Sequence, residues 1–535
     1  MEKMENIIPF KNSGKTWIKE AINFLKSSYG LLVLLIIVVA SFMRLYKISE
    51  YMTFLGDEGR DALVAKEIIE GNLTLLGPRA SAGDFFLGPV YYYMIAPFLA
   101  IFNYDPVGPA VMVALIGVLT VFLVYIFTQK FFNKPAGLIA ALLYAISPLV
   151  IAFSRSSWNP NPVPFFTLLL MLALYFSVKN NSVKLSLLVG LLLGILLQLH
   201  YIAVFIGVIV FVFVLIGNFL LEKKGLFKKY ALQYSTIFTG FLLGLSPFLL
   251  FELRHGFPNI KTIFSFIFVN NFQVDRVQEL SHLEIVQDVL FRLFARLIFN
   301  YPPIEQIESF NLMHIQVLQI LTVTLIVSSV ISLLIIKKKL IVVLLLLWLL
   351  LGVFLFGFYK KEIYDYYYGF LFPVPFILIG NLLASLMKVS GRFRYIAFTS
   401  GLVIFIALFV NLILNNPFQY QGNNQKREAE NIANKVIEVT NGRPYNFALI
   451  TAGNSDHVYR YFLEIKNREP IVIESLETDP ERNSVTDQLI VICDLECSPL
   501  GDPLWEVAGF GRAEIDGQWE VPFVTIYKLV PFQEN

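Results

Sequence analysis

The sequence predicts a polytopic α-helical membrane protein with a soluble α/β domain at its C-terminal end. Of its 535 residues, 56% are hydrophobic and 15% are charged, whereas a soluble protein carries roughly 25% charged residues. Residues 415–535 contain 19 acidic and 10 basic side chains, and the preceding residues contain 21 acidic and 32 basic ones. Because the basic residues lie in short loops between apolar runs, they indicate membrane topology, and no nucleic-acid partner is expected.

About eleven stretches are apolar and long enough to cross a lipid bilayer, which takes about 20 residues. They are 29–48, 107–128, 135–153, 162–178, 185–203, 204–221, 232–250, 312–336, 340–358, 366–387 and 394–414. A turn near His200 and Tyr201 divides the almost unbroken apolar run in the middle of this set. Residues 1–28 are expected to be a cytoplasmic N-terminus without a cleavable signal peptide, because the first apolar run is too long for one.

The distribution of basic loops fixes the predicted orientation through the positive-inside rule. The basic segments, which the rule places in the cytoplasm, are 11–26, 130–134, 179–184, 223–229, 337–339 and 388–394. The transmembrane domain, 29–414, then has external loops at 49–106 and 251–311 with helices against the membrane, and the domain at 415–535 is extracytoplasmic. Segment 85–102 would invert every later loop if it crossed, so we expect an interfacial or re-entrant helix there. The protein is expected in the plasma (inner) membrane.

The C-terminal domain shows alternating helix and strand patterns. Helices are expected at 425–440 and, with Ser455 as the capping residue, through 465. Strands are expected at 446–451, 470–474, 488–493, 503–509 and 521–529. The only cysteines are Cys493 and Cys497. Outside the cytoplasm they can form a disulfide, and two buried free thiols are the alternative.

An acidic pair, Asp57 and Glu58, lies shortly after the first predicted span. Charge is expensive close to hydrocarbon, so a carboxylate pair held there is a candidate functional site. One carboxylate can act as a general base that takes a proton from an acceptor hydroxyl or amine. The alternative is a structural pair in the first turn of a helix, where the macrodipole favours negative charge.

Positive side chains also occur in loops that the topology places outside the cell. They are Arg155, Arg254 beside His255, and Lys360 beside Lys361. Arginine offers a bidentate fork and lysine a point charge, as the binding of a phosphate headgroup requires. Alternatively, these side chains extend to the phospholipids of the outer leaflet.

Aromatic and polar residues near these cations complete the candidate site. Segment 364–373 gathers four tyrosines, including Tyr366 and Tyr367, which either line a sugar or phosphate site or form part of an aromatic belt. Further residues that can line a cavity are Arg60, Tyr91, Asn159, His200, Tyr201 and Tyr366. The interpretation of His200 and Tyr201 as a satisfied interior pair stays open, as does that of Asn159 as a turn residue.

Taken together, these motifs resemble those of the GT-C superfamily of integral-membrane glycosyltransferases. The resemblance is to the bacterial branch of family 39, which includes proteins similar to dolichyl-phosphate-mannose protein mannosyltransferases and to the aminoarabinose transferases of lipid A. The matching segments are 56–78, 85–93, 154–166, 246–259 and 364–375. Where many relatives have Lys-Pro-Pro or His-Pro-Pro, this chain has Leu87-Gly88-Pro89, which puts a donor-phosphate or acceptor contact there in doubt.

The resemblance implies a polyprenyl-phosphate-linked sugar donor, an extracytoplasmic acceptor that is a protein, polysaccharide or lipid glycan, and inversion at the anomeric carbon. It places the general base at Asp57, with Glu58 as its partner. It also implies donor-phosphate contacts from Arg155, Arg254, His255, Lys360 and Tyr367. Some members of the superfamily need a divalent metal, and the sequence offers no convincing ligand set for one.

Two other functions remain open at this stage. A flippase or transporter of lipid-linked sugars would use similar headgroup contacts, but transporters usually carry ionisable residues in mid-membrane and repeated halves. The central positions of the predicted spans are nearly free of charge, and no repeat is visible. A non-catalytic membrane protein could instead bind glycans through its C-terminal domain. Binding by that domain without turnover by the full chain would favour this function.

Overall fold

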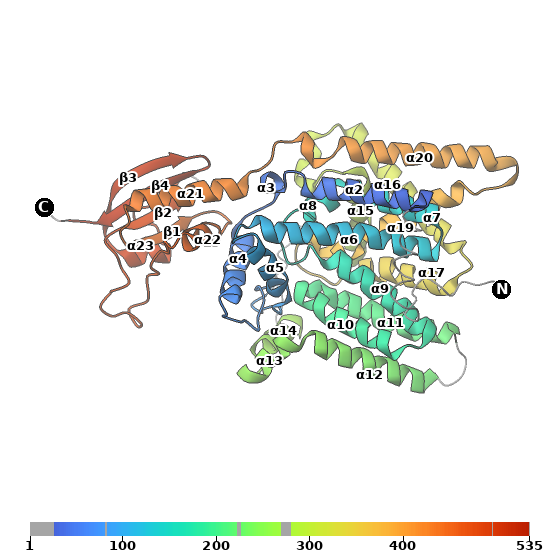
Figure 1. Cartoon of the computed structure of the whole chain (residues 1–535), viewed down its shortest axis with the longest axis horizontal. Helices are drawn as coiled ribbons and strands as arrows, with labels where there is room; N and C mark the ends of the chain where they lie inside the picture. The colour runs from blue at the N-terminus through green and yellow to red at the C-terminus, as the bar shows by residue number, and fades with distance from the viewer. Residues whose placement is uncertain (1–25, 81–82, 222–225, 269–279, 495, 534–535) are drawn as a thin grey trace.

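The computed structural model describes residues 26–80, 83–221, 226–268, 280–494 and 496–533. A helical bundle and a smaller C-terminal domain lie end to end along the long axis of the molecule (Figure 1). The bundle contains α2 (Ser28–Leu45), α3 (Ile48–Tyr51), α4 (Gly56–Ile69), α5 (Val90–Ile101), α6 (Val107–Phe131), α7 (Lys134–Ile146), α8 (Pro148–Phe153), α9 (Val163–Asn180), α10 (Val183–Leu199), α11 (Val204–Leu221), α12 (Leu226–Gly244), α13 (Ser246–His255), α14 (Pro258–Phe268), α15 (His282–Phe299), α16 (Leu312–Leu334), α17 (Lys339–Leu346), α18 (Gly352–Phe356), α19 (Pro373–Leu386) and α20 (Arg394–Leu414). Short helical turns at η1 (Tyr201–Ala203), η2 (Ile304–Ser309), η3 (Leu347–Leu351), η4 (Asp365–Leu371), η5 (Gly391–Phe393) and η6 (Pro417–Gln419) connect them.

The polytopic helical architecture is confirmed, with fewer full-length spans than the eleven expected. Over the described ranges, seven helices are long and apolar enough to cross a membrane, or up to nine if two bent pairs each count as one span. The bent pairs are α12 with α13, at 73°, and η4 with α19, at 52°. The predicted spans 135–153 and 185–203 fall on helices of 13 and 17 residues, α7 and α10. The first is shortened because Pro148 interrupts the helix after Ser147 and starts α8.

Some bundle helices begin or end at residues that pair their terminal backbone groups or turn the chain. The Asn133 side chain accepts a hydrogen bond from the Ala136 N–H at 3.1 Å at the start of α7. Asn181 has a left-handed conformation at the end of α9, and the Ser182 side chain caps α10 through the Leu185 N–H at 3.4 Å. Such polar caps satisfy backbone groups that a helix terminus leaves unpaired. Local sequence therefore contributes to the bounds of α7, α9 and α10.

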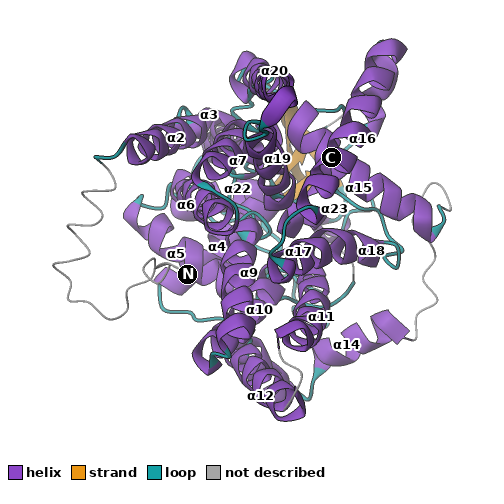
Figure 2. Ribbon diagram, turned by 90° about the vertical axis from the view of Figure 1, so that its right-hand side faces the viewer, coloured by secondary structure: helices purple, strands orange, loops and turns teal. Residues whose placement is uncertain are grey.

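The elements of both predicted external loops gather at the bundle end that faces the C-terminal domain. Helices α4, α5, α13 and α14 lie there (Figure 1). The expected short helix is α5, whose 12 residues are too few to cross a bilayer. Helix α15 also belongs to the predicted loop 251–311. It buries Val289, Leu293 and Leu297 completely, and it packs against α16 and α18 within the bundle (Figure 2).

The C-terminal domain is a four-stranded sheet with helices. It contains α21 (Gln425–Thr440), β1 (Asn446–Ile450), α22 (His457–Ile465), β2 (Leu489–Cys493), α23 (Trp505–Phe510), β3 (Ala513–Val521) and β4 (Val524–Pro531). The strand order is β1-β2-β4-β3, with β1 parallel to β2 and the other pairs antiparallel. Cys493 and Cys497 form a disulfide, as one of the two open interpretations predicted.

Several predicted strands of this domain differ in the structure. Segment 503–509 falls on α23, in which Val507 and Phe510, three residues apart, share the buried face of the helix. Segment 470–474 has irregular backbone. Strand β3 was not expected, since its residues are mostly exposed and it pairs only with β4 at the sheet edge.

Glycines allow α10 and α12 to pack closely, and we predict that this contact does not tolerate a methyl group. A Cβ at Gly240 would overlap the carbonyl oxygen of Leu187, whereas a Cβ at Gly207 would meet only Leu193 side-chain atoms, the nearest at 3.7 Å. We expect Gly240→Ala to destabilise the protein by about 1–3 kcal/mol through overpacking. Thermal unfolding in detergent measures the change, with Gly207→Ala as the control. Equal midpoints for the two variants would contradict the prediction.

Candidate active site

Glu58 caps the helix that carries the acidic pair. Its Oε2 accepts a hydrogen bond from the Leu55 N–H at 3.0 Å, and its Oε1 accepts one from the Thr53 hydroxyl at 2.7 Å. The side chain is buried, and this burial raises the pKa of Glu58. Both carboxylate oxygens therefore have structural partners at the start of α4.

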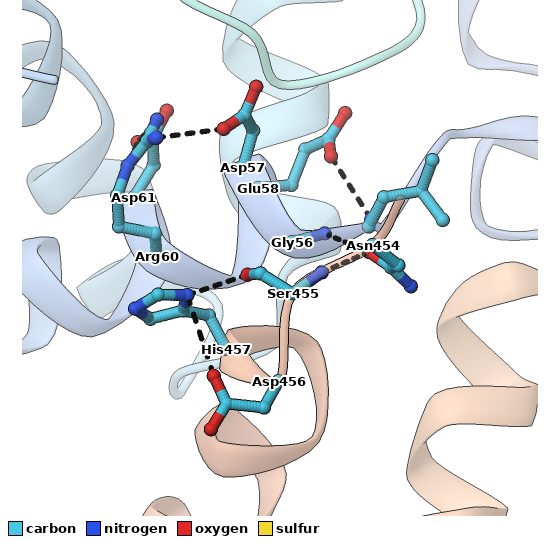
Figure 3. Close-up of polar contacts among 10 residues, drawn as sticks. Gly56, Asp57, Glu58, Arg60, Asp61, Asn454, Ser455, Asp456 and His457 are labelled. Atoms are coloured by element: carbon cyan, nitrogen blue, oxygen red, sulfur yellow. Dashed lines mark hydrogen bonds and ion pairs between the residues drawn. The ribbon is translucent and has the colours of Figure 1, made fainter. Parts of the chain in front are cut away.

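Asp57 is the more accessible member of the pair. Its side chain is 52% exposed, and its Oδ1 accepts a hydrogen bond from Arg60 Nη1 at 2.7 Å. Arg60 also donates from Nε and Nη2 to Oδ1 of Asp61, at 3.0 and 2.7 Å. The carboxylates of Asp57 and Glu58 thus turn to different partners (Figure 3).

A cavity of about 560 Å³ opens beside Asp57. It is lined by Asp57, Arg60, Pro78, Arg79, Ala80, Gly83, Asp84, Leu87, Trp158, Asn159, Pro160, His200, Tyr201, Lys361 and Tyr366. These residues come from the start of α4, from the segment between α4 and α5, and from the turns after α8 and α10. Lys361 precedes η4, and Tyr366 lies within it. Its volume is in the range of small-molecule sites, about 300–1,000 Å³.

An aromatic wall closes one side of this cavity. The His200 ring stacks on Tyr201 with centroids 4.7 Å apart, and the Tyr366 ring lies 4.3 Å from Trp158. The hydroxyls of Tyr201 and Tyr359 are 2.8 Å apart. The Asn159 amide donates to the Leu199 carbonyl at 2.6 Å, which ties the turn after α8 to the end of α10.

The structure brings about half of the sequence-predicted residues to the cavity. Those that line it are Asp57, Arg60, Asn159, His200, Tyr201 and Tyr366. The sequence interpretation did not assign Arg79, Lys361 and Trp158 to the site, although it named Lys361 as a neighbour of Lys360. The signal that selected Lys360, positive charge in a predicted external loop, also applies to Arg79 and Lys361.

The other predicted residues lie outside the cavity lining, for identifiable reasons. Arg155 is 1% exposed and donates to the carbonyls of Met43 and Tyr46 at 2.9 and 2.6 Å. It therefore provides hydrogen-bond donors for carbonyl groups at the end of α2. The remaining predicted residues outside the lining are Glu58, Tyr91, Arg254, His255, Lys360 and Tyr367. Of these, Arg254, His255 and Lys360 are exposed, whereas Tyr91 and Tyr367 are buried.

The C-terminal domain packs directly against the helix that carries Asp57. The Gly56 N–H donates to Asn454 Oδ1 at 3.0 Å, and a Cβ at Gly59 would lie 2.6 Å from the Val458 nitrogen. At the other end of α4, Lys66 pairs with Glu464 at 2.9 Å. The segment from Asn454 to His457 therefore approaches α4 closely (Figure 3).

A second imidazole, that of His457 at the start of α22, lies beside α4. His457 Nδ1 lies 2.6 Å from the Ser455 hydroxyl, so Ser455 contacts this ring instead of capping the helix as expected. Burial lowers the pKa of His457, with smaller contributions from nearby charges that include Arg60 and Asp57. Over the described part of the chain, no three acidic, histidine or cysteine side chains cluster in a way that could hold a metal ion.

Comparisons with known proteins identify the architecture. A family profile described as dolichyl-phosphate-mannose-protein mannosyltransferase matches residues 87–251. ArnT from Cupriavidus metallidurans in the apo state aligns with a TM-score of 0.58 and 11% identity, covering 97% of this chain and 98% of that chain. The chain has the ArnT fold.

Two further solved structures support this assignment. ArnT bound to undecaprenyl phosphate gives a TM-score of 0.56 at 10% identity, covering 96% of this chain and 98% of that chain. The oligosaccharyltransferase AglB from Archaeoglobus fulgidus, in complex with an inhibitory peptide and a dolichol-phosphate, gives a TM-score of 0.51 at 15% identity, covering 88% of this chain and 70% of that chain. A search of curated protein sequences gave no significant match. The expected GT-C fold with a C-terminal sheet domain is confirmed.

We predict that Glu58 contributes to stability through its cap. Glu58→Ala removes the acceptor for the Leu55 N–H and the Thr53 hydroxyl, and should cost about 1 kcal/mol. Glu70→Ala, which removes only a half-exposed ion pair with Lys66 on the same helix, should change stability by less than about 0.5 kcal/mol. Thermal unfolding of both variants measures the difference. A Glu58 variant as stable as the Glu70 variant would show that the cap contributes nothing.

Proposed function

We propose that this protein is a membrane glycosyltransferase that moves a sugar from a polyprenyl-phosphate donor to an extracytoplasmic acceptor, with inversion at the anomeric carbon. Asp57 is the general base of the proposed reaction. The acceptor is a protein, a polysaccharide or a lipid glycan. The N-terminus then lies in the cytoplasm of a cell whose plasma membrane the bundle spans, and the C-terminal domain lies outside.

The composition of the cavity is the observation that carries this proposal. A half-exposed carboxylate, Asp57, shares a cavity of about 560 Å³ with the cations Arg79 and Lys361. A general base and cations for a leaving phosphate are what direct displacement at a sugar carbon needs. The aromatic wall adds ring faces and hydroxyls, which are suited to binding a sugar.

The proposed step is a single displacement. The acceptor oxygen or nitrogen attacks the anomeric carbon while the carbon–oxygen bond to the donor phosphate breaks. The acceptor proton passes to an oxygen of Asp57, and the electron pair of the broken bond stays on the lipid phosphate. Positive charge from Lys361 and Arg79 would stabilise the phosphate as its charge increases, an effect often worth several kcal/mol.

The relatives favour a lipid-phosphate donor. The ArnT structure contains undecaprenyl phosphate, and the AglB structure contains a dolichol-phosphate and an inhibitory peptide. The mannosyltransferase profile matches 87–251, which includes α5 and the cavity residues Trp158 and His200. These similarities favour transfer chemistry over the flippase and the non-catalytic glycan-binding protein, since those alternatives need no base in the headgroup cavity.

We predict that Asp57→Asn reduces the rate of transfer by about a hundredfold or more, because an amide cannot take the acceptor proton. Turnover is measured as release of undecaprenyl phosphate from a panel of radiolabelled undecaprenyl-phosphate sugars, with envelope extract from a deletion strain as acceptor. Glu67→Gln on the exposed face of α4 is the control. A rate for Asp57→Asn close to that of wild type would remove the assigned base. Mass spectrometry of envelope glycans from the deletion strain would name the transferred sugar.

Two adjacent lysines give a matched test of the phosphate site. Lys361 lines the cavity, whereas Lys360 is exposed and lies outside the lining. Lys361→Ala should weaken binding of undecaprenyl phosphate about tenfold, which corresponds to the loss of about one charge-assisted contact. Lys360→Ala should leave the affinity unchanged. Titration in detergent by microscale thermophoresis measures both, and equal effects of the two substitutions would mean that the lipid phosphate binds elsewhere.

A further inference from the structure

A second carboxylate on α4, Asp61, shares the guanidinium group that holds the proposed base. Asp61 is completely buried, whereas the Asp57 side chain is half exposed. Arg60 directs Nε and Nη2 to Oδ1 of Asp61 and Nη1 to Oδ1 of Asp57. One arginine fork is thus divided between a buried acid and an acid in the cavity (Figure 3). The proposed displacement assigns no role to Asp61.

This division limits how strongly Arg60 can bind the base. An arginine beside a single carboxylate tends to form two parallel hydrogen bonds, which would engage both oxygens of Asp57. Asp61 retains two of the donors, so that only one reaches Asp57. We propose that Asp61 is a positioning residue that withholds part of the Arg60 fork from Asp57 and so sets the strength of Asp57 as a base. The inference rests on the proposed function.

The surroundings of Asp61 make its own charge responsive to pH. Burial raises the pKa of Asp61 to about 7, although Arg60 opposes this shift. Its Oδ2 has no hydrogen-bond partner in the described structure. The titratable groups that face this cluster are Arg60, Asp57 and Glu58 on α4, Tyr91 and Tyr92 on α5, and His457 on α22.

The direction of the effect follows from the charges. When Asp61 is ionised, it competes for Arg60, and the proton affinity of Asp57 rises. When Asp61 is protonated, it loses its negative charge and Arg60 pairs more fully with Asp57, which lowers the proton affinity of the base. The rate of the proposed transfer should therefore rise with pH through the titration of Asp61.

Infrared titration tests the sharing of Arg60 without any substrate. In the full-length protein in detergent, the carbonyl band of a protonated carboxylic acid should disappear near pH 7. Asp61→Asn should abolish that transition, whereas Glu58→Gln should leave it. Asp57→Asn should shift the transition to lower pH, because Arg60 then pairs with Asp61 alone, and Glu67→Gln on the same helix should not. No transition near neutral pH, or an equal midpoint in Asp57→Asn, would overturn the proposal.

The pH dependence of turnover tests the consequence for the base. With any undecaprenyl-phosphate sugar that the wild type consumes, the rate constant at saturating donor should rise about threefold through neutral pH, because ionised Asp61 makes Asp57 a stronger base and proton transfer becomes faster with base strength. Asp61→Asn should hold the rate at the acid-side value of the wild type throughout. If the rate constant of Asp61→Asn is lower than that of the wild type by the same factor at every pH, the role of Asp61 is purely structural. If the wild type consumes none of the donors, the proposed function fails while the infrared result still decides whether Arg60 is shared.

Discussion

The candidate site depends on the close contact between α4 and the C-terminal domain. Gly56 and Gly59 leave room for the backbone at the start of α22, and a side chain at either position would collide with it. The Gly56 N–H, directly before the proposed base, is bonded to Asn454. At the far end of the helix, the Lys66–Glu464 ion pair completes the contact. The soluble domain is therefore part of the framework that positions Asp57, although it follows the bundle in sequence.

The bundle supports the same site from the opposite side. Gln198, near the end of α10, donates to the Gly244 carbonyl at 2.5 Å and accepts from the Val90 N–H at 3.2 Å. The start of α5 is thereby fixed to the membrane helices. The buried carboxylate of Glu252 accepts from the Asn259 amide at 2.8 Å, and Asn259 accepts from the Phe86 N–H at 2.8 Å. The two predicted external loops are consequently connected through buried polar groups. Leaving such a group without a hydrogen bond destabilises the protein more than leaving an exposed group without one.

Sequence patterns predicted the fold better than they predicted the roles of single charges. Apolar length predicted the helical bundle, although with more spans than the described residues contain, because each span must pair its own backbone groups within the membrane. Sequence patterns could not assign different roles to Asp57 and Glu58. The difference arises because Glu58 accepts hydrogen bonds from Leu55 and Thr53 and so caps the helix. Nor could these patterns show that Arg155 binds the end of α2, because its partners are carbonyl groups more than 100 residues away.

The C-terminal domain shows the same limit in its strands. Helix α21 and strands β1 and β2 lie close to their predicted positions, since their apolar residues follow the period of the element that they form. Strand β3 carries no such signal, because it lies at the sheet edge and most of its side chains are exposed. Pairing with β4 across a tight connection determines it. Edge strands of this kind depend on a partner that periodicity does not reveal.

The arrangement of ion pairs gives the cavity two unlike sides. Arg79 pairs with Asp84 at 2.6 Å where both side chains are largely exposed, so water and a phosphate can compete for it at little cost. Arg60 pairs with the fully buried Asp61, and removing that partner would leave an unpaired charge in a poorly solvated place. A phosphate entering the cavity would therefore displace Asp84 more easily than it would displace Asp61. In the proposed reaction, this difference directs the donor phosphate toward Arg79 and Lys361 and leaves the Arg60 side, with Asp57, to the incoming acceptor.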